Sequence, residues 1–240
     1  MKILGIDSSG LVASVALVED DLLIAEYDLQ YKITHSQTLL PILEDIKNRI
    51  DLDMQTIDAI AVAAGPGSFT GLRIGAATVK GFGLALGKPI IPIPTLEGMA
   101  YNCYGTDLLV CPIMDARRNQ VYTGLYEFVK EETITMKTVM DQSALSFAEL
   151  AEKLNEIGRE VLFLGDGVPV FQKNMEELLK VKYHLAPAHM NRQRASALAT
   201  LGRVKYDAGL YESAAEHAPE YLRLSQAERE RKEKEQGQEV

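Results

Sequence analysis

Alternating and clustered hydrophobic positions divide the first half of the chain into short strands and amphipathic helices. The predicted strands, in chain order, are KILGID, SVALVE, LLIAEYDL and IDAIAVAA. Between Thr38 and Ile50 apolar residues recur at helical spacing, which predicts a helix with Thr38 as its N-cap and Pro41 in its first turn. A glycine-rich turn then leads into a helix over about Phe69–Leu86, and IPIP leads into a short helix around Leu96–Tyr104.

The second half repeats this order of elements. LLVCPIMDARR, VYTGLYEF and TITMKTVM are predicted strands, followed by a helix at Phe147–Ile157, the strand EVLFLGDG and a helix at Pro169–Leu179. Each half therefore reads β-β-β-α-β-α, and in each the fourth strand ends in a glycine turn. This repetition predicts an α/β protein with a duplicated, actin-like or ribonuclease-H-like fold, in which mixed sheets are flanked by helices.

The repeat also suggests where one lobe ends and the next begins. We expect a first lobe over residues 1–104, completed by a returning segment at 191–223 that contains a helix at Arg192–Ala208. The second lobe is expected over 105–190. Residues 224–240 form a charged tail without an apolar stripe, which predicts either a mobile segment or a solvated helix that becomes ordered only on a partner.

Composition and charge exclude several classes of protein. The 240 residues are 47% hydrophobic, but no apolar run reaches membrane-spanning length, and the N-terminus reads as a strand and not as a signal peptide. Two cysteines are too few for a disulfide framework, so we expect a cytoplasmic protein. A formal net charge of -9 without a basic stripe argues against binding nucleic acid alone.

Aspartates follow three of the predicted strands. Asp7, with Ser8, Ser9 and Gly10 after it, occupies the place where an actin-like phosphotransferase holds a metal–nucleotide complex, and Asp115 and Asp166 follow strands of the second half. Aspartate is also a common capping residue where a strand stops. The capping role is favoured for Asp115 and Asp166, and both interpretations stay open for Asp7.

The glycine turn between Gly65 and Gly75 resembles a phosphate-binding loop but lacks its lysine. It also fails the GxGxxG pattern of dinucleotide-binding proteins. Ser68 is the expected N-cap of the following helix, whose N-terminus can attract an anion without specifying one. Asp7, Ser9, Gly67 and Ser68 are accordingly the weak candidates for cofactor binding.

Four glycines inside the helix that follows require a tertiary explanation, because each costs roughly 1 kcal/mol relative to alanine. Gly71, Gly75 and Gly83 share one face, which allows another backbone to approach closely. We expect this face and the neighbouring apolar stripe to receive a second chain, although contact with the chain's own sheet stays a competing interpretation. The predicted partner interface consists of Leu39, Leu43, Ile46, Ile50, Phe69, Gly71, Leu72, Gly75, Val79, Phe82 and Gly83.

Three motifs carry a resemblance to a known family. GPGSFTGLRIG, together with ILGIDSS at the start and PEYLR near the end, resembles the bacterial TsaB family, also called YeaZ. The resemblance covers residues 1–223. It implies a two-lobed actin-like fold and a role in forming threonylcarbamoyladenosine beside the tRNA anticodon.

The resemblance also implies a set of partners. In that system the chemistry belongs to the related protein TsaD, whose metal is held by two histidines of an HxxxH motif. Thr95 and Met99 stand at those places here, and neither can replace an imidazole on the metal. The resemblance thus implies a non-catalytic scaffold that dimerises with itself or with TsaD, is joined by the ATPase TsaE, and meets tRNA only through the complex.

Two alternatives remain open. The first is an actin-like ATPase or phosphotransferase with Asp7 as its metal carboxylate. The second is a metal-dependent peptidase, which no cluster of metal-ligating residues supports. The scaffold is expected to bind no cofactor on its own, and an adenine nucleotide at its junction with the partner is the remaining cofactor hypothesis.

Overall fold

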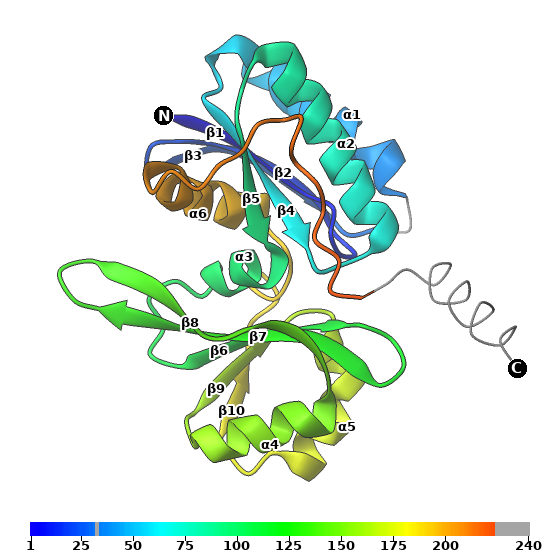
Figure 1. The fold of residues 1–240 in the computed structure, drawn as a ribbon, viewed down its shortest axis with the longest axis vertical. Helices are drawn as coiled ribbons and strands as arrows, with labels where there is room; N and C mark the ends of the chain where they lie inside the picture. The colour runs from blue at the N-terminus through cyan, green and yellow to red at the C-terminus, as the bar shows by residue number, and fades with distance from the viewer. Residues whose placement is uncertain (32–33, 224–240) are drawn as a thin grey trace, which may run out of the picture.

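A computed structural model describes residues 1–31 and 34–223, which form two α/β lobes stacked end to end (Figure 1). The predicted tail at 224–240 lies outside the described residues. No helix within 1–31 and 34–223 is long and apolar enough to cross a membrane.

The first lobe is built on a five-stranded sheet with strand order β3-β2-β1-β4-β5. Its elements are β1 (Lys2–Asp7), β2 (Ala13–Glu19), β3 (Leu22–Leu29), α1 (His35–Arg49), the 3-10 turn η1 (Met54–Thr56), β4 (Ala59–Gly65), α2 (Phe69–Leu86), β5 (Ile90–Pro94) and α3 (Thr95–Tyr101). β1 runs antiparallel to β2 and parallel to β4. β1 is therefore the central strand, and Asp7 with the following loop lies at its C-terminal end.

The second lobe repeats this topology with strand order β8-β7-β6-β9-β10. Its elements are β6 (Leu109–Asp115), β7 (Gln120–Lys130), β8 (Ile134–Ser146), α4 (Phe147–Ile157), β9 (Val161–Leu164), α5 (Gly167–Leu178) and β10 (Tyr183–Leu185). β6 is antiparallel to β7 and parallel to β9, as β1 is to β2 and β4. The predicted duplicated fold of mixed sheets is therefore confirmed.

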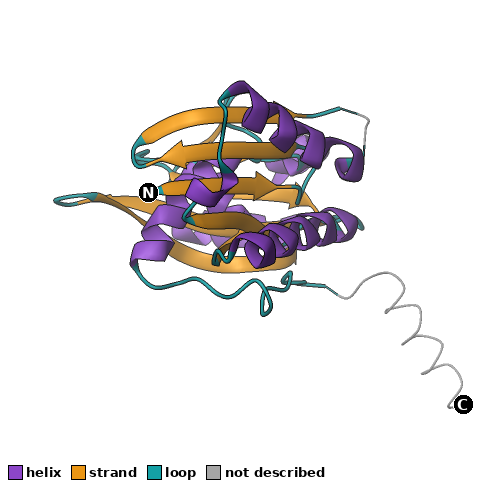
Figure 2. Cartoon of the chain, turned by 90° about the horizontal axis from the view of Figure 1, so that it is seen from above, coloured by secondary structure: helices purple, strands orange, loops and turns teal. Residues whose placement is uncertain are grey.

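Helices cover both faces of the first sheet (Figures 1 and 2). On one face Leu4 and Ile6 pack with residues of α1 and α2. On the other face Ile3 packs against Leu198 of α6 (Ala195–Asp207), so a helix from the end of the chain completes the first lobe. Because both faces are covered, all residues of β1 after Lys2 are buried.

The start of α1 differs from the prediction. The helix begins at His35 with Thr34 as its N-cap, whereas Thr38 lies within it and donates its hydroxyl to the Thr34 and His35 carbonyls. The apolar stripe does not extend into the first turn of the helix, because that turn faces a pocket and not the core. The start of the helix was therefore predicted too late. Pro41 consequently lies inside the helix, where the carbonyl of the exposed Gln37 is left to solvent.

Other predicted boundaries differ by a few residues. The short helix α3 begins at Thr95 and ends at Tyr101, and α6 begins at Ala195 after an extended Arg194. The strand β8 extends to Ser146, well beyond the predicted stretch. The structure agrees with the predicted bounds of α2 and α4.

Candidate functional site

The loop after β1 and the glycine turn before α2 bind each other directly. The Ser68 backbone N–H donates to the Ser9 carbonyl at 2.6 Å, and the Ser8 hydroxyl donates to the Gly71 carbonyl at 2.9 Å. A methyl group on Gly67 or Gly71 would overlap the carbonyl of Ser9 or Ser8, respectively. The glycines of this turn therefore serve close packing of two backbone segments within one chain.

Asp7 is buried beneath this loop. One of its carboxylate oxygens accepts the Ser9 N–H at 2.8 Å and the Ser9 hydroxyl at 2.6 Å. Burial outweighs these bonds and raises the pKa of Asp7 to about 6 from 3.8. Asp7 caps the loop in this structure, and it does not line the adjacent pocket.

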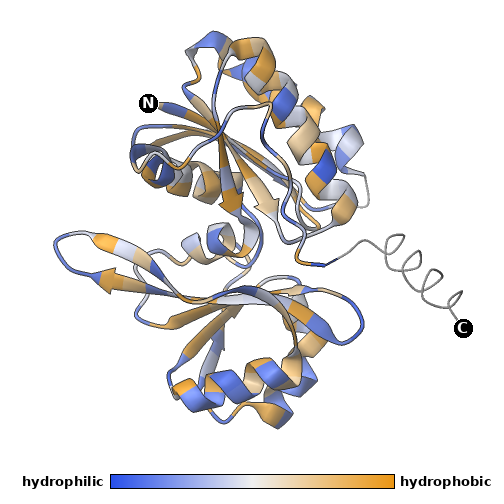
Figure 3. Ribbon diagram, in the orientation of Figure 1, coloured by the Kyte–Doolittle hydropathy of each residue, from blue (hydrophilic) through white to orange (hydrophobic). Residues whose placement is uncertain are grey.

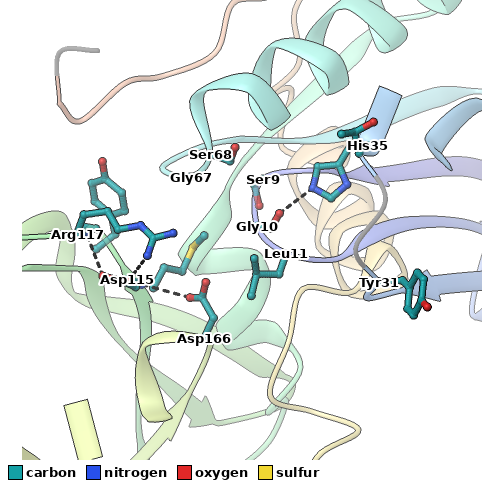
Figure 4. Close-up of a pocket in the computed structure, with 14 residues that line it drawn as sticks. Ser9, Gly10, Leu11, Tyr31, His35, Gly67, Ser68, Asp115, Arg117 and Asp166 are labelled. Atoms are coloured by element: carbon teal, nitrogen blue, oxygen red, sulfur yellow. Dashed lines mark hydrogen bonds and ion pairs between the residues drawn. The ribbon is translucent and has the colours of Figure 1, made fainter. Parts of the chain in front are cut away.

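A pocket of about 520 Å³ separates the ends of β1 and β4 in the first lobe from the ends of β6 and β9 in the second (Figure 4). Its lining residues are Ser9, Gly10, Leu11, Tyr31, Thr34, His35, Gly67, Ser68, Met114, Asp115, Ala116, Arg117, Tyr122 and Asp166. The predicted candidates Ser9, Gly67 and Ser68 thus meet on one wall. Ser68 is the N-cap of α2, as predicted, and its hydroxyl accepts the Gly71 N–H at 3.2 Å.

His35 joins the same wall from the first turn of α1. Its Nε2 donates to the Gly10 carbonyl at 2.8 Å, so the imidazole fixes the loop after Asp7. Nδ1 is buried and has no hydrogen-bond partner among the described residues. His35 was not among the predicted site residues, because the helix was expected to begin four residues later.

The opposite wall carries Asp115, Arg117 and Asp166. The Arg117 backbone N–H and guanidinium donate to the Asp115 carboxylate at 2.8 and 3.1 Å, and the Asp115 N–H donates to Asp166 at 3.3 Å. Burial raises the pKa of Asp166. Asp115 therefore closes the β6–β7 turn, and Asp166 accepts a backbone N–H at the end of β6 but makes no side-chain capping bond to α5. Both side chains satisfy backbone N–H groups where a strand ends, as predicted.

The interpretations that require a metal ion need a cluster of metal-ligating side chains. No group of three or more His, Cys, Asp or Glu side chains within 1–31 and 34–223 is arranged to hold an ion. Thr95 and Met99 lie fully buried on α3, where Met99 packs with Leu96 and Leu164. Neither side chain lines the pocket between the lobes.

The structure places the predicted partner-interface residues inside the chain. Leu39, Leu43, Ile46, Leu72, Val79, Gly71, Gly75 and Gly83 are buried, and Ile50, Phe69 and Phe82 are partly buried. A side chain at Gly75 would meet the Ser8 hydroxyl at 2.7 Å, and one at Gly83 would meet the Ala214 Cβ at 2.7 Å. The expectation that this glycine face receives a second chain is therefore wrong for this structure: the chain's own β1 loop and C-terminal segment occupy it.

The outward sides of α1 and α2 present different residues. Leu40 is 51% exposed and Leu84 is 65% exposed, and Pro41, Ala77 and Gly81 are also exposed. A side chain at Gly81 would meet nothing within 4 Å. We call Leu40, Pro41, Ala77, Gly81 and Leu84 the outer surface of α1 and α2. Figure 3 shows the hydrophobic positions of these adjacent helices mixed with hydrophilic ones.

The family model and two related sequences that match this chain belong to proteins of tRNA threonylcarbamoyladenosine formation. The family model for TsaD, tRNA N6-adenosine threonylcarbamoyltransferase, matches residues 30–231. A tRNA threonylcarbamoyladenosine biosynthesis protein TsaB from Bacillus subtilis is 38% identical over 228 residues, covering 95% of this chain and 96% of that protein. The Escherichia coli protein of the same name is 31% identical over 169 residues, covering 70% and 72%.

Solved structures agree with the sequence matches. YeaZ from Pseudomonas aeruginosa superposes with a TM-score of 0.78 at 25% identity, covering 92% of this chain and 99% of that one. A second P. aeruginosa structure, titled an uncharacterized protein with similarity to peptidase YeaZ, has a TM-score of 0.79 at 25% identity and the same coverage.

Proposed function

The chain belongs to the TsaB family, and from this premise we propose that it is a non-catalytic scaffold that pairs with TsaD to form tRNA threonylcarbamoyladenosine. The family takes part in the biosynthesis of that modified nucleoside. The finer role proposed here is support of the catalytic subunit. In the absence of TsaD the chain pairs with itself, and TsaE joins the assembled complex.

The observation that carries the non-catalytic role is the packing of α3. Thr95 and Met99 stand where the resemblance places the metal-binding histidines of the catalytic relative. Both are enclosed by the core between the lobes, in which Leu96, Ala100 and Leu164 are also fully buried. Two imidazoles and an ion would have no open coordination position there, which a catalytic metal requires.

The surface proposed for pairing is the outer surface of α1 and α2. The glycine face is filled from within, but the two helices contact each other, so their outward residues share one side of the first lobe. Small residues at Ala77 and Gly81 leave the helix backbone accessible, and Leu40 and Leu84 add apolar area. A helical partner surface can pack closely on such a strip.

Size-exclusion chromatography of the purified chain mixed with TsaD tests the proposal. The wild-type chain and TsaD should co-elute as a heterodimer, and Gly81→Leu should abolish co-elution because the new side chain projects outward into the partner. Gly81→Ala is the matched conservative variant and should retain pairing. Lys173→Leu, which adds the same side chain on α5, should pair like the wild type.

Two results would contradict the proposal. One is co-elution of Gly81→Leu with TsaD at wild-type affinity, which would place the interface elsewhere. The other is ATP hydrolysis by the purified chain that Asp7→Asn abolishes, which would favour the actin-like ATPase interpretation.

A further inference from the structure

Residues 211–223, which we call the C-terminal strap, run along the first lobe after α6. Glu212 and Ile90 exchange two backbone hydrogen bonds of 2.9 Å, so the strap begins by pairing with the edge of β5. Ala214 is buried in the core of the lobe, against Gly83. The Lys80 ammonium donates to the carbonyls of Ala215 and His217 at 3.0 and 2.7 Å, which holds the strap along α2.

The strap then reaches the glycine turn beside the pocket. The Glu220 N–H donates to the Ala64 carbonyl at 2.7 Å, and the Glu220 carbonyl occupies the place where a side chain on Gly65 would stand. The Tyr221 ring lies 4.4 Å from the Phe69 ring, measured between centroids. These contacts attach the strap to the N-terminal end of α2.

The end of the strap crosses to the second lobe. The Arg223 guanidinium donates to the Ala116 carbonyl at 2.8 Å, and Ala116 lines the pocket between the lobes. From the second lobe, the Gln142 amide on β8 donates to the Gly65 carbonyl at 3.2 Å and to the Glu220 carboxylate at 3.4 Å. The glycine turn and the strap thus share a set of bonds that spans both lobes.

The covalent connections between the lobes lie at another place. The chain crosses once after α3 and returns between β10 and α6. The Asn102 side chain donates to the Met190 and Arg192 carbonyls at 3.2 and 2.7 Å, which ties the two crossings together. Figure 1 shows the strap, in orange, running along the first lobe and ending between the lobes, apart from α3.

We propose that the C-terminal strap is a clasp that sets the angle between the lobes and therefore the width of the pocket. Two segments joined at one hinge keep rotational freedom, and a second attachment point removes it. At the clasp, hydrogen bonds of Arg223 and Gln142 join the lobes, whereas the hinge side combines the covalent connections with the buried core around α3. Release of the Arg223 and Gln142 contacts leaves both lobes folded, lets them turn about the Asn102 hinge, and opens the pocket.

Distance measurement between spin labels in the full-length chain tests this clasp. Cys103 and Cys111 are buried, so labels attach at cysteines introduced at Lys47 on α1 and Lys173 on α5, both exposed. Labelled protein is diluted in excess unlabelled protein so that only distances within one chain are recorded. Gln142→Ala/Arg223→Ala removes the side-chain hydrogen bonds between the lobes at the clasp. It should shift the distribution to longer values, with the open fraction rising about tenfold, as loss of a charge-assisted hydrogen bond predicts.

Two control variants separate the clasp from a general loss of charge. Arg223→Lys keeps a donor and should give a distribution closer to the wild type. Arg159→Ala removes an exposed arginine whose ion pair with Glu127 lies within the second lobe, and it should change nothing. A wild-type distribution in the double variant, with wild-type hydrogen exchange of residues 115–122, would overturn the proposal. So would a shift that Arg159→Ala reproduces. Neither result depends on TsaD.

Discussion

The carboxyl group of Asp7 lies at the end of the central strand, where an actin-like enzyme would hold its metal, yet the loop after β1 covers it. A side chain on Gly10 would meet the amide group of Gln193, which lies far along the chain, so Gln193 would have to move. Ser9 satisfies the Asp7 carboxylate with two hydrogen bonds. The enclosure makes the charged form of Asp7 unfavourable in the folded protein.

The raised pKa of Asp7 predicts a specific dependence of stability on pH. Between 3.8 and about 6 the unfolded chain loses a proton that the folded protein keeps, so this group lowers the free energy of unfolding as pH rises through that range. Asp7→Asn removes this loss while keeping an oxygen acceptor for Ser9. The unfolding free energy of Asp7→Asn minus that of the wild type should therefore increase by about 2 kcal/mol between pH 4 and pH 7.

Urea unfolding at the two pH values measures this shift. Asp21→Asn, at an exposed position, is the control and should show no comparable change. A variant that loses stability relative to the wild type as pH rises would show that the folded protein uses the Asp7 charge.

At the scale of elements, α2 carries four glycines with different surroundings. Gly71 packs against the Ser8 backbone, whereas Gly81 on the outward side has open space. At an entropic cost, glycine therefore allows close internal packing at Gly71, whereas at Gly81 no internal contact requires a glycine.

Alanine at these two positions should have opposite effects on stability. Gly71→Ala forces a methyl group into the β1 loop and should lower the free energy of unfolding by about 1–3 kcal/mol. Gly81→Ala should raise it by up to about 1 kcal/mol, because alanine favours the helix and nothing is displaced. Chemical unfolding of both variants checks this, and equal effects of the same sign would contradict the assigned packing.

Hydrophobic spacing predicted elements best where one face is buried along their whole length. The bounds of α2 agree because Ser68 caps its start and Gly87, in a left-handed conformation, ends it. The first turn of α1 faces the pocket, so it carries no apolar signal, and His35 was missed for that reason. The three-residue strand β10 was also missed, since so short a segment has no period.

At the scale of the whole molecule, α6 makes the first lobe discontinuous in sequence. Leu198 of α6 is buried against Gly98 of α3 and the first sheet. Leu154 of α4 is buried in the core of the second lobe. The two residues therefore report on different lobes.

Leu198→Ala and Leu154→Ala should each cost about 2–5 kcal/mol, but in different parts of the chain. Leu198→Ala should weaken hydrogen-exchange protection of β1 and β4 and leave β6 and β9 protected. Leu154→Ala should do the reverse. Hydrogen exchange with mass spectrometry measures both, and loss of protection across both lobes in either variant would contradict separate cores.

The amino-acid sequence by itself determined the order of elements, the duplication and the cap at Ser68, because these depend on local periodicity and on side chains close in the chain. It also carried the TsaB motifs, and it has Thr95 and Met99 at the places where the resemblance implies the histidines of TsaD. Only the tertiary structure decided that Asp7 is enclosed, that His35 and Arg117 face one pocket, and that the glycine face of α2 is filled from within. Those outcomes depend on contacts between distant segments, and a glycine that admits a neighbouring backbone looks the same in sequence whether that neighbour is its own chain or another.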